Sequence, residues 1–182
     1  IRMGDNRDLT LTTYLSTGTR TLEARYRQAF ATGDIEVNAA VSQDSLSSET
    51  RSYVFAEGTF DLGRDYTLYF DIEAASDPAY LLDYGYSEKD RLDSAITLLR
   101  VGKDDLFQAN LTYFQTLRAD DDNASLPPIV GSLSYAKQQY LANGGRLRTG
   151  LSADTRSRSG SGLRAHAHAA PPSVPSARAA PH

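Results

Sequence analysis

Apolar and polar side chains alternate one by one along most of this chain, in stretches of about ten residues. A period of two is the pattern of a β-strand with one apolar and one polar face. The clearest stretch runs from residue 66 to residue 74, where every even position is aromatic, aliphatic or alanine. The pattern predicts about nine strands, at residues 8–16, 21–30, 35–42, 51–61, 66–74, 91–101, 107–113, 129–136 and 146–153.

The connections between these strands alternate between short and long. Tight turns rich in Gly and Asp follow the second, fourth and sixth strands, whereas polar segments at 44–50, 76–90 and 118–128 follow the third, fifth and seventh. Soluble strands usually stop at about five or six residues, but a tilted strand needs roughly 9–11 residues to cross a bilayer. Outer-membrane barrels also have short periplasmic turns and long outer loops. We therefore predict an all-β fold, an antiparallel meander that forms part of a larger outer-membrane β-barrel.

Composition excludes several classes of chemistry. The net charge of −4 does not suggest a nucleic-acid partner. There is no cysteine, which excludes disulfides, thiol nucleophiles and Cys-based metal sites. All three histidines lie in residues 155–182, so the strand region cannot supply a Ser-His-Asp or Cys-His site. We predict that the chain is not an enzyme, and we assign no catalytic, cofactor, metal or substrate-binding residue.

Two polar clusters have ordinary interpretations. His166 and His168 alternate with alanine and have no carboxylate near them in sequence. Three aspartates at 120–122 carry the oxygen ligands that Ca²⁺ prefers, but the other ligands of a defined loop are missing. We interpret the first cluster as part of a solvated segment and the second as a solvated loop tip.

The chain divides in two by composition. Residues 1–154 carry 15 basic and 23 acidic side chains, whereas residues 155–182 carry four arginines and no acid. The second part consists mainly of Ala, Pro, Ser, Arg and His, a composition that predicts disorder. Its abrupt onset suggests a shifted reading frame or a truncation. The sequence opens without the apolar segment of an export signal. With an odd number of strands and two open edges, residues 1–154 are expected to be part of a larger closed barrel.

The polar faces of the strands and the positions of the tyrosines each allow two interpretations. Charged and amide side chains on neighbouring strands would line a wet lumen in a barrel or a solvent face in a sandwich, and strand length favours the barrel. Tyrosines near strand ends would form an interfacial girdle or simply reflect strand preference. The polar-face residues are Glu23, Arg25, Arg27, Glu36, Asn38, Asp71 and Glu73, and the strand-end tyrosines are Tyr14, Tyr53, Tyr66, Tyr113 and Tyr135.

Several segments resemble a known family. The most distinctive are Phe-Asp-Leu-Gly-Arg-Asp-Tyr at 60–66, Ser-Asp-Pro-Ala-Tyr-Leu at 76–81 and Tyr-Gly at 84–85. The segments at 8–12, 22–27 and 33–35 look like the first barrel strands of that family, and the segment at 126–130 resembles a Leu-Pro-containing segment further along its barrel. Over residues 7–153 the chain resembles LptD, the lipopolysaccharide (LPS) assembly protein of the outer membrane, also called organic solvent tolerance protein, OstA or Imp.

The resemblance implies a function in the cell outer membrane. A protein of that family would insert LPS into the outer leaflet, with a lipoprotein plug (LptE) in its lumen and periplasmic bridge proteins that deliver LPS. No covalent bond would be made or broken. Inward residues such as Arg25, Arg27, Asp71 and Glu73 would suit contact with phosphates, sugars or the plug. Outer-membrane lipid would surround the apolar faces, and no nucleic acid is implied.

Two other classes remain open at this stage. A porin-type or autotransporter barrel would show the same strands but would pass solutes or a passenger domain. A soluble β-sandwich or lipocalin-like binding module would bury the apolar faces against each other. An outer-membrane hydrolase is disfavoured because the strand region has no histidine.

Overall fold

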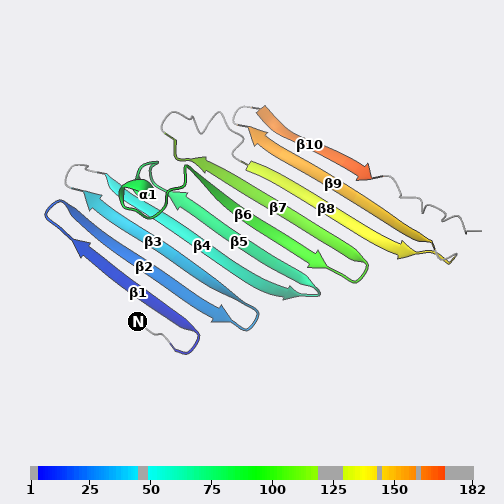
Figure 1. Ribbon diagram of the computed structural model, residues 1–182, viewed down its shortest axis with the longest axis horizontal. Coiled ribbons are helices and arrows are strands. Elements are labelled where there is room, and N and C mark those ends of the chain that lie inside the picture. The colour runs from blue at the N-terminus through cyan, green and yellow to red at the C-terminus, as the bar shows by residue number, and fades with distance from the viewer. Residues whose placement is uncertain (1–3, 45–48, 119–128, 143–144, 159–160, 171–182) are drawn as a thin grey trace, which may run out of the picture.

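A computed structural model describes residues 4–44, 49–118, 129–142, 145–158 and 161–170. They form one antiparallel sheet of ten strands in chain order, so each strand pairs with the one before it and the one after it (Figure 1). The predicted all-β meander is confirmed. The strands are β1 (Arg7–Leu15), β2 (Thr19–Phe30), β3 (Gly33–Asp44), β4 (Thr50–Gly63), β5 (Tyr66–Ala75), β6 (Arg91–Val101), β7 (Asp105–Thr116), β8 (Ile129–Tyr140), β9 (Arg146–Arg158) and β10 (Ser161–Ala170).

Most strands are 10–14 residues long, and β1 has nine. Short turns join β2 to β3, β4 to β5 and β6 to β7 at one rim of the sheet, here called the short-turn rim. The 76–90 segment leaves from the opposite, long-loop rim. In the β4–β5 turn, Gly63, Arg64 and Asp65 all have positive φ. Positive φ at both central residues gives a hairpin turn the twist of its flanking strands.

The end of the sheet differs from the sequence prediction. β9 continues to Arg158 and β10 spans Ser161–Ala170, so a disordered tail from residue 155 is corrected for these residues. In β10, alanine alternates with arginine and histidine; alanine is a weak strand former, so composition suggested disorder. The strand at 165–170 instead depends on its continuous pairing with β9.

Residues 171–182 and the aspartates at 120–122 lie outside the described residues. With ten strands in the described part, the argument from an odd number no longer applies.

The ladder between β5 and β6 covers only part of their length. It runs from Tyr66, opposite Arg100, to Asp71, opposite Ala95, and ends there. Beyond that point, the Ser94 hydroxyl accepts from the backbone N–H of Glu73 and donates to its carbonyl, both at 2.9 Å. The backbone of β5 thus keeps hydrogen bonds where β6 no longer pairs with it. We call this region, where β5 and β6 separate, the β5–β6 seam.

A second side chain also hydrogen-bonds to the backbone of β5 in the seam. The Gln115 side-chain amide on β7 donates to the Ala75 carbonyl at 2.9 Å and accepts from the Ala75 N–H at 3.4 Å. Two polar side chains therefore replace backbone partners at the outer end of β5. An exposed ladder would be costly in a bilayer, because no water is there to satisfy it.

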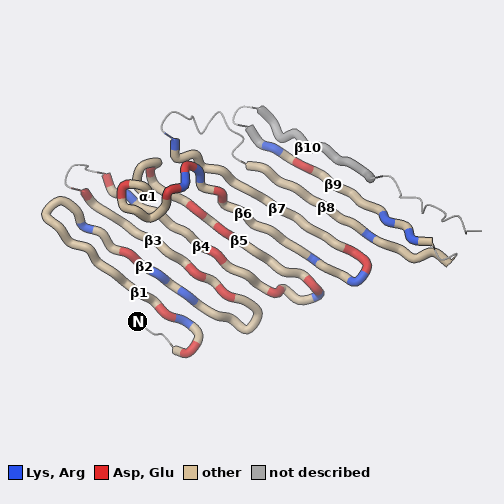
Figure 2. The backbone as a smooth tube through the Cα atoms, viewed as in Figure 1, with Lys and Arg blue, Asp and Glu red and all other residues tan. Residues whose placement is uncertain are grey.

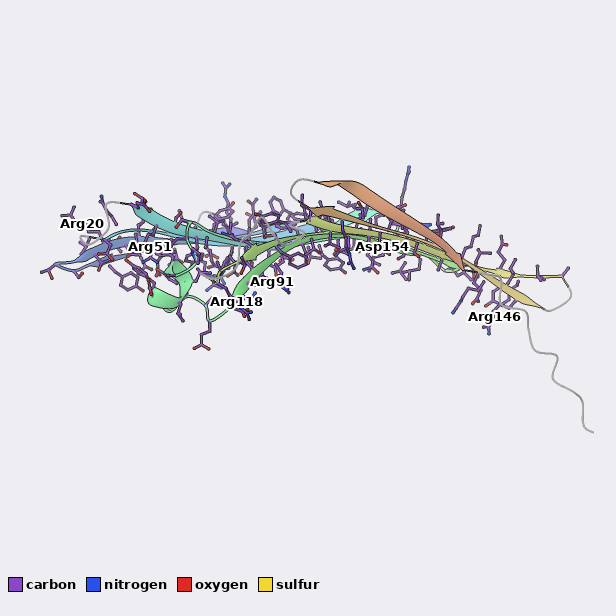
Figure 3. The ribbon with its side chains drawn as sticks, turned by 90° about the horizontal axis from the view of Figure 1, so that it is seen from above. Arg20, Arg51, Arg91, Arg118, Arg146 and Asp154 are labelled. Carbon is purple, nitrogen blue, oxygen red and sulfur yellow. The ribbon has the colours of Figure 1, made fainter. Side chains whose placement is uncertain are left out.

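The buried hydrophobic cluster of the described residues lies beside the seam, where the connection between β5 and β6 packs against the sheet. The short helix α1 (Tyr80–Asp83) sits in the long connection between β5 and β6. Tyr80, Leu81 and Leu92 have no exposed surface, and Leu117 is nearly buried. Seen edge-on, α1 projects from one face of a gently curved sheet (Figure 3). In the part of the chain that the structure describes, no helix has the length and hydrophobicity to cross a membrane.

Candidate functional site

One face of the sheet is apolar across nine strands. The register carries it from strand to strand: Leu11 lies opposite Ala24, Ala24 opposite Ala39, and Ala39 opposite Val54. Large apolar side chains of this face are exposed rather than packed under a second layer. They include Leu11, Leu22, Val41, Val54, Ile96, Leu111, Leu133 and Leu151.

Charges on this apolar face stand near the strand ends. Arg20 lies at the long-loop rim, whereas Arg100, Asp105 and Lys137 lie toward the short-turn rim. Across the middle of β1 to β9, the register places no charged residue on this face. An Arg or Lys facing lipid costs roughly 2–4 kcal/mol at the bilayer midplane and much less near the interface. The distribution is the one that a lipid-facing band requires.

The opposite face is polar and carries ion pairs. Arg25 contacts Glu36 at 2.8 Å and Arg27 contacts Asp8 at 2.9 Å. Glu36, Glu57 and Asp71 lie directly opposite one another on three neighbouring strands, and acidic positions gather on β3 to β5 (Figure 2). The register confirms that the polar residues named from the sequence share this one face: Glu23, Arg25, Arg27, Glu36, Asn38, Asp71 and Glu73.

The connection between β5 and β6, here called the 76–90 loop, folds back over the polar face. The Tyr86 hydroxyl donates to Glu23 on β2 at 2.6 Å. The Tyr80 hydroxyl lies 2.7 Å from the Ser42 hydroxyl on β3, which in turn lies 2.7 Å from that of Thr21 on β2. The loop thus reaches across β4 and β3 to β2.

Arg51, near the start of β4, binds the loop at one residue before α1 and at the last residue of α1. Its guanidinium contacts Asp77 at 2.7 Å and Asp83 at 3.0 Å, and it lies over the rings of Tyr80 and Tyr84. The hydrogen bonds from Arg51 lower the pKa of the Asp77 carboxyl below its ordinary value. Since Arg51 is largely covered, this contact is better protected from solvent than an exposed surface pair.

Four tyrosines form an aromatic group between the loop and β4, here called the tyrosine cluster. Tyr80, Tyr84 and Tyr86 come from the loop and Tyr53 comes from β4. Ring centroids lie 4.6 Å apart for Tyr53 and Tyr86 and 4.8 Å apart for Tyr80 and Tyr84. These separations fall in the range of favourable aromatic pairs. Burial raises the pKa of Tyr86, and its bond to Glu23 adds to that shift.

The sequence did not predict this arrangement. From the sequence, Tyr53 is either part of an interfacial girdle or an ordinary strand tyrosine; in the structure it packs in the tyrosine cluster on the polar face. For residues 76–90 the sequence predicts only a long polar outer loop. Its one apolar run, Tyr-Leu-Leu at 80–82, was the signal that could have indicated a buried anchor.

The chain was also compared with known proteins. A family model described as LptD, LPS transport system D, matches residues 49–170. This chain belongs to the LptD family. The match includes the 60–66 and 76–85 segments and ends where β10 ends. LptD is a transport and assembly family of the outer membrane and not an enzyme family. No curated protein matched the chain.

Proposed function

We propose that this chain forms part of the barrel wall of the translocon that inserts LPS into the outer leaflet of the cell outer membrane. The main support is that the two faces of the sheet differ, in a chain that belongs to the LptD family. One face is an exposed apolar band, and the other is polar and mixed in charge. The apolar band would contact outer-membrane lipid, and the polar face would line the lumen.

Partners follow from the same arrangement. LPS would pass along the polar face, where side chains can contact its sugars and phosphates. A lipoprotein plug of the LptE kind would sit against the same lumen, and periplasmic LPS-bridge proteins would deliver LPS from the short-turn rim. Nothing in this picture requires nucleic acid or a cofactor.

β1 and β10 are the two edges of the described sheet. Unpaired backbone groups each cost several kcal/mol in hydrocarbon. We infer that further strands, from the same polypeptide or from another, pair with these edges and close the ring. A soluble β-sandwich would instead cover the apolar band with a second sheet.

The test is depletion of this protein in the cells that make it, followed by surface labelling of newly made LPS with a reagent that cannot cross the outer membrane. We expect the label on new LPS to fall as the protein is depleted and to return when the wild-type gene is restored. Unchanged LPS labelling with reduced uptake of small solutes would instead indicate a porin, and loss of a displayed passenger would indicate an autotransporter.

A further inference from the structure

A cavity of about 690 Å³ lies where the 76–90 loop meets the β1–β2 hairpin. Its walls include Tyr84 and Tyr86 from the loop, Glu23 and Thr21 from β2, and Tyr14 from β1. The volume lies within the usual range for small-molecule sites. The cavity opens on the polar face, near the long-loop rim.

The walls combine two kinds of recognition chemistry. The Tyr84 and Tyr86 rings are nearly parallel, with 3° between their planes and 6.2 Å between their centroids. Beside them, the Glu23 carboxylate accepts from Tyr86, and a carboxylate has further acceptor capacity after one such bond. Flat apolar rings next to hydrogen-bonding oxygens suit a ligand with C–H faces and hydroxyl edges.

Contacts with neighbouring side chains also fix the positions of the cavity walls. Thr21 and Ser42 are at least 95 % buried and hydrogen-bond each other, and Ser42 contacts the Tyr80 hydroxyl. Tyr86 packs against Tyr53, and Tyr84 packs against Tyr80. A site whose side chains are already ordered loses less conformational entropy on binding. The cavity is therefore a built site and not a gap between mobile side chains.

We propose that this cavity binds a neutral saccharide unit, with its rings on Tyr84 and Tyr86 and its hydroxyls on Glu23. Glu23 is the one charged side chain among the cavity walls that the structure describes, and its negative charge disfavours phosphate and favours uncharged sugar rings. The proposal rests on the proposed function, because it makes the cavity a contact point for the sugar part of LPS on its way through the lumen.

The experiment measures binding of maltohexaose, a neutral oligosaccharide, by calorimetry to the full-length protein in detergent. We expect saturable binding that Tyr84→Phe leaves within about twofold, because the ring remains. Tyr84→Leu should weaken it by about tenfold, the scale of one aromatic contact. Tyr69→Leu is the matched control, since Tyr69 lies on the same face, outside the cavity walls, and it should leave binding unchanged.

A second readout separates binding from folding. A nitroxide at Leu82→Cys, an exposed loop position, reports whether the loop stays docked in each variant. No maltohexaose binding by wild-type protein, or equal binding by Tyr84→Leu with a docked loop, would overturn the proposal. Either result leaves the LPS-labelling test untouched, so failure here is distinguishable from failure of the proposed function.

Discussion

Arg51 joins the carboxylate of Asp77, before α1, to that of Asp83, the last residue of α1, so this single side chain has a large share in docking the 76–90 loop. A guanidinium can offer two or more donors to carboxylates in fixed directions, which a lysine cannot do. The contact lies at the long-loop rim, at the start of β4. Its strength should therefore depend on the ionisation of the acids that it binds.

We predict that acid loosens the 76–90 loop. The pKa of Asp77 is lowered in the folded protein. The stability that it contributes is therefore complete above the unfolded pKa of about 3.9 and is lost as pH falls through the lower folded value. The mobility of a nitroxide at Leu82→Cys, measured by electron paramagnetic resonance, should stay constant from about pH 6 to about pH 4 and rise as the pH falls further.

Asp77→Asn provides the control for this prediction. The variant keeps the size of the side chain but removes its titration, so the loop should already be more mobile at pH 6 and change less on acidification. Asp83, Glu23 and Glu73 also contact Arg51 or the loop, so some change should remain. An identical pH profile in Asp77→Asn and wild type would exclude Asp77 as the cause.

Among the strands, the β5–β6 seam is where the regular ladder gives way to side chains. Ser94 and Gln115 bond to the backbone of Glu73 and Ala75. This arrangement allows β5 and β6 to separate beside the 76–90 loop while the backbone groups of Glu73 and Ala75 on β5 keep hydrogen-bond partners. The seam and the docked loop are thus parts of one local structure.

We predict that Gln115→Leu destabilises the protein by about 1–3 kcal/mol, because it leaves the part-buried backbone N–H and carbonyl of Ala75 without this partner. The measurement is the midpoint of denaturant unfolding in detergent. Gln108→Leu is the matched control, because Gln108 lies exposed on the polar face of the same strand and should change stability by less than about 0.5 kcal/mol. Equal effects of the two substitutions would contradict a bridging role for Gln115.

The sheet as a whole has one apolar and one polar face, and we expect the two faces to contact different solvents. Leu133 and Ser134 are neighbours near the middle of β8, and both are exposed. The register places Leu133 on the apolar face, opposite Ala109 and Ala153, and Ser134 on the polar face. The pair therefore reports directly which solvent each face meets.

We predict opposite environments for nitroxides at Leu133→Cys and Ser134→Cys after reconstitution into lipid vesicles. The chain has no cysteine, so each label is unique. The label at 133 should be relaxed mainly by oxygen, which concentrates in the bilayer, and the label at 134 by a water-soluble nickel complex. A label at 133 shielded from both reagents would indicate a second protein layer, as in a β-sandwich.

The strands and their two faces follow from the sequence alone, because alternation is a local property of neighbouring residues. All nine strands predicted from it are present, and the polar set from Glu23 to Glu73 shares one face. The tenth strand needed the pairing of β10 with β9, since Ala-rich composition carries little strand preference of its own.

The candidate site, in contrast, depends on contacts between distant positions. Tyr86 reaches Glu23 across 63 residues of chain, and Tyr80 reaches Ser42 across 38. No periodicity encodes such pairs, because they arise only when strands stand side by side and the loop folds back over them. The apolar face was therefore predictable from the residues, whereas the tyrosine cluster and its cavity required the assembled sheet.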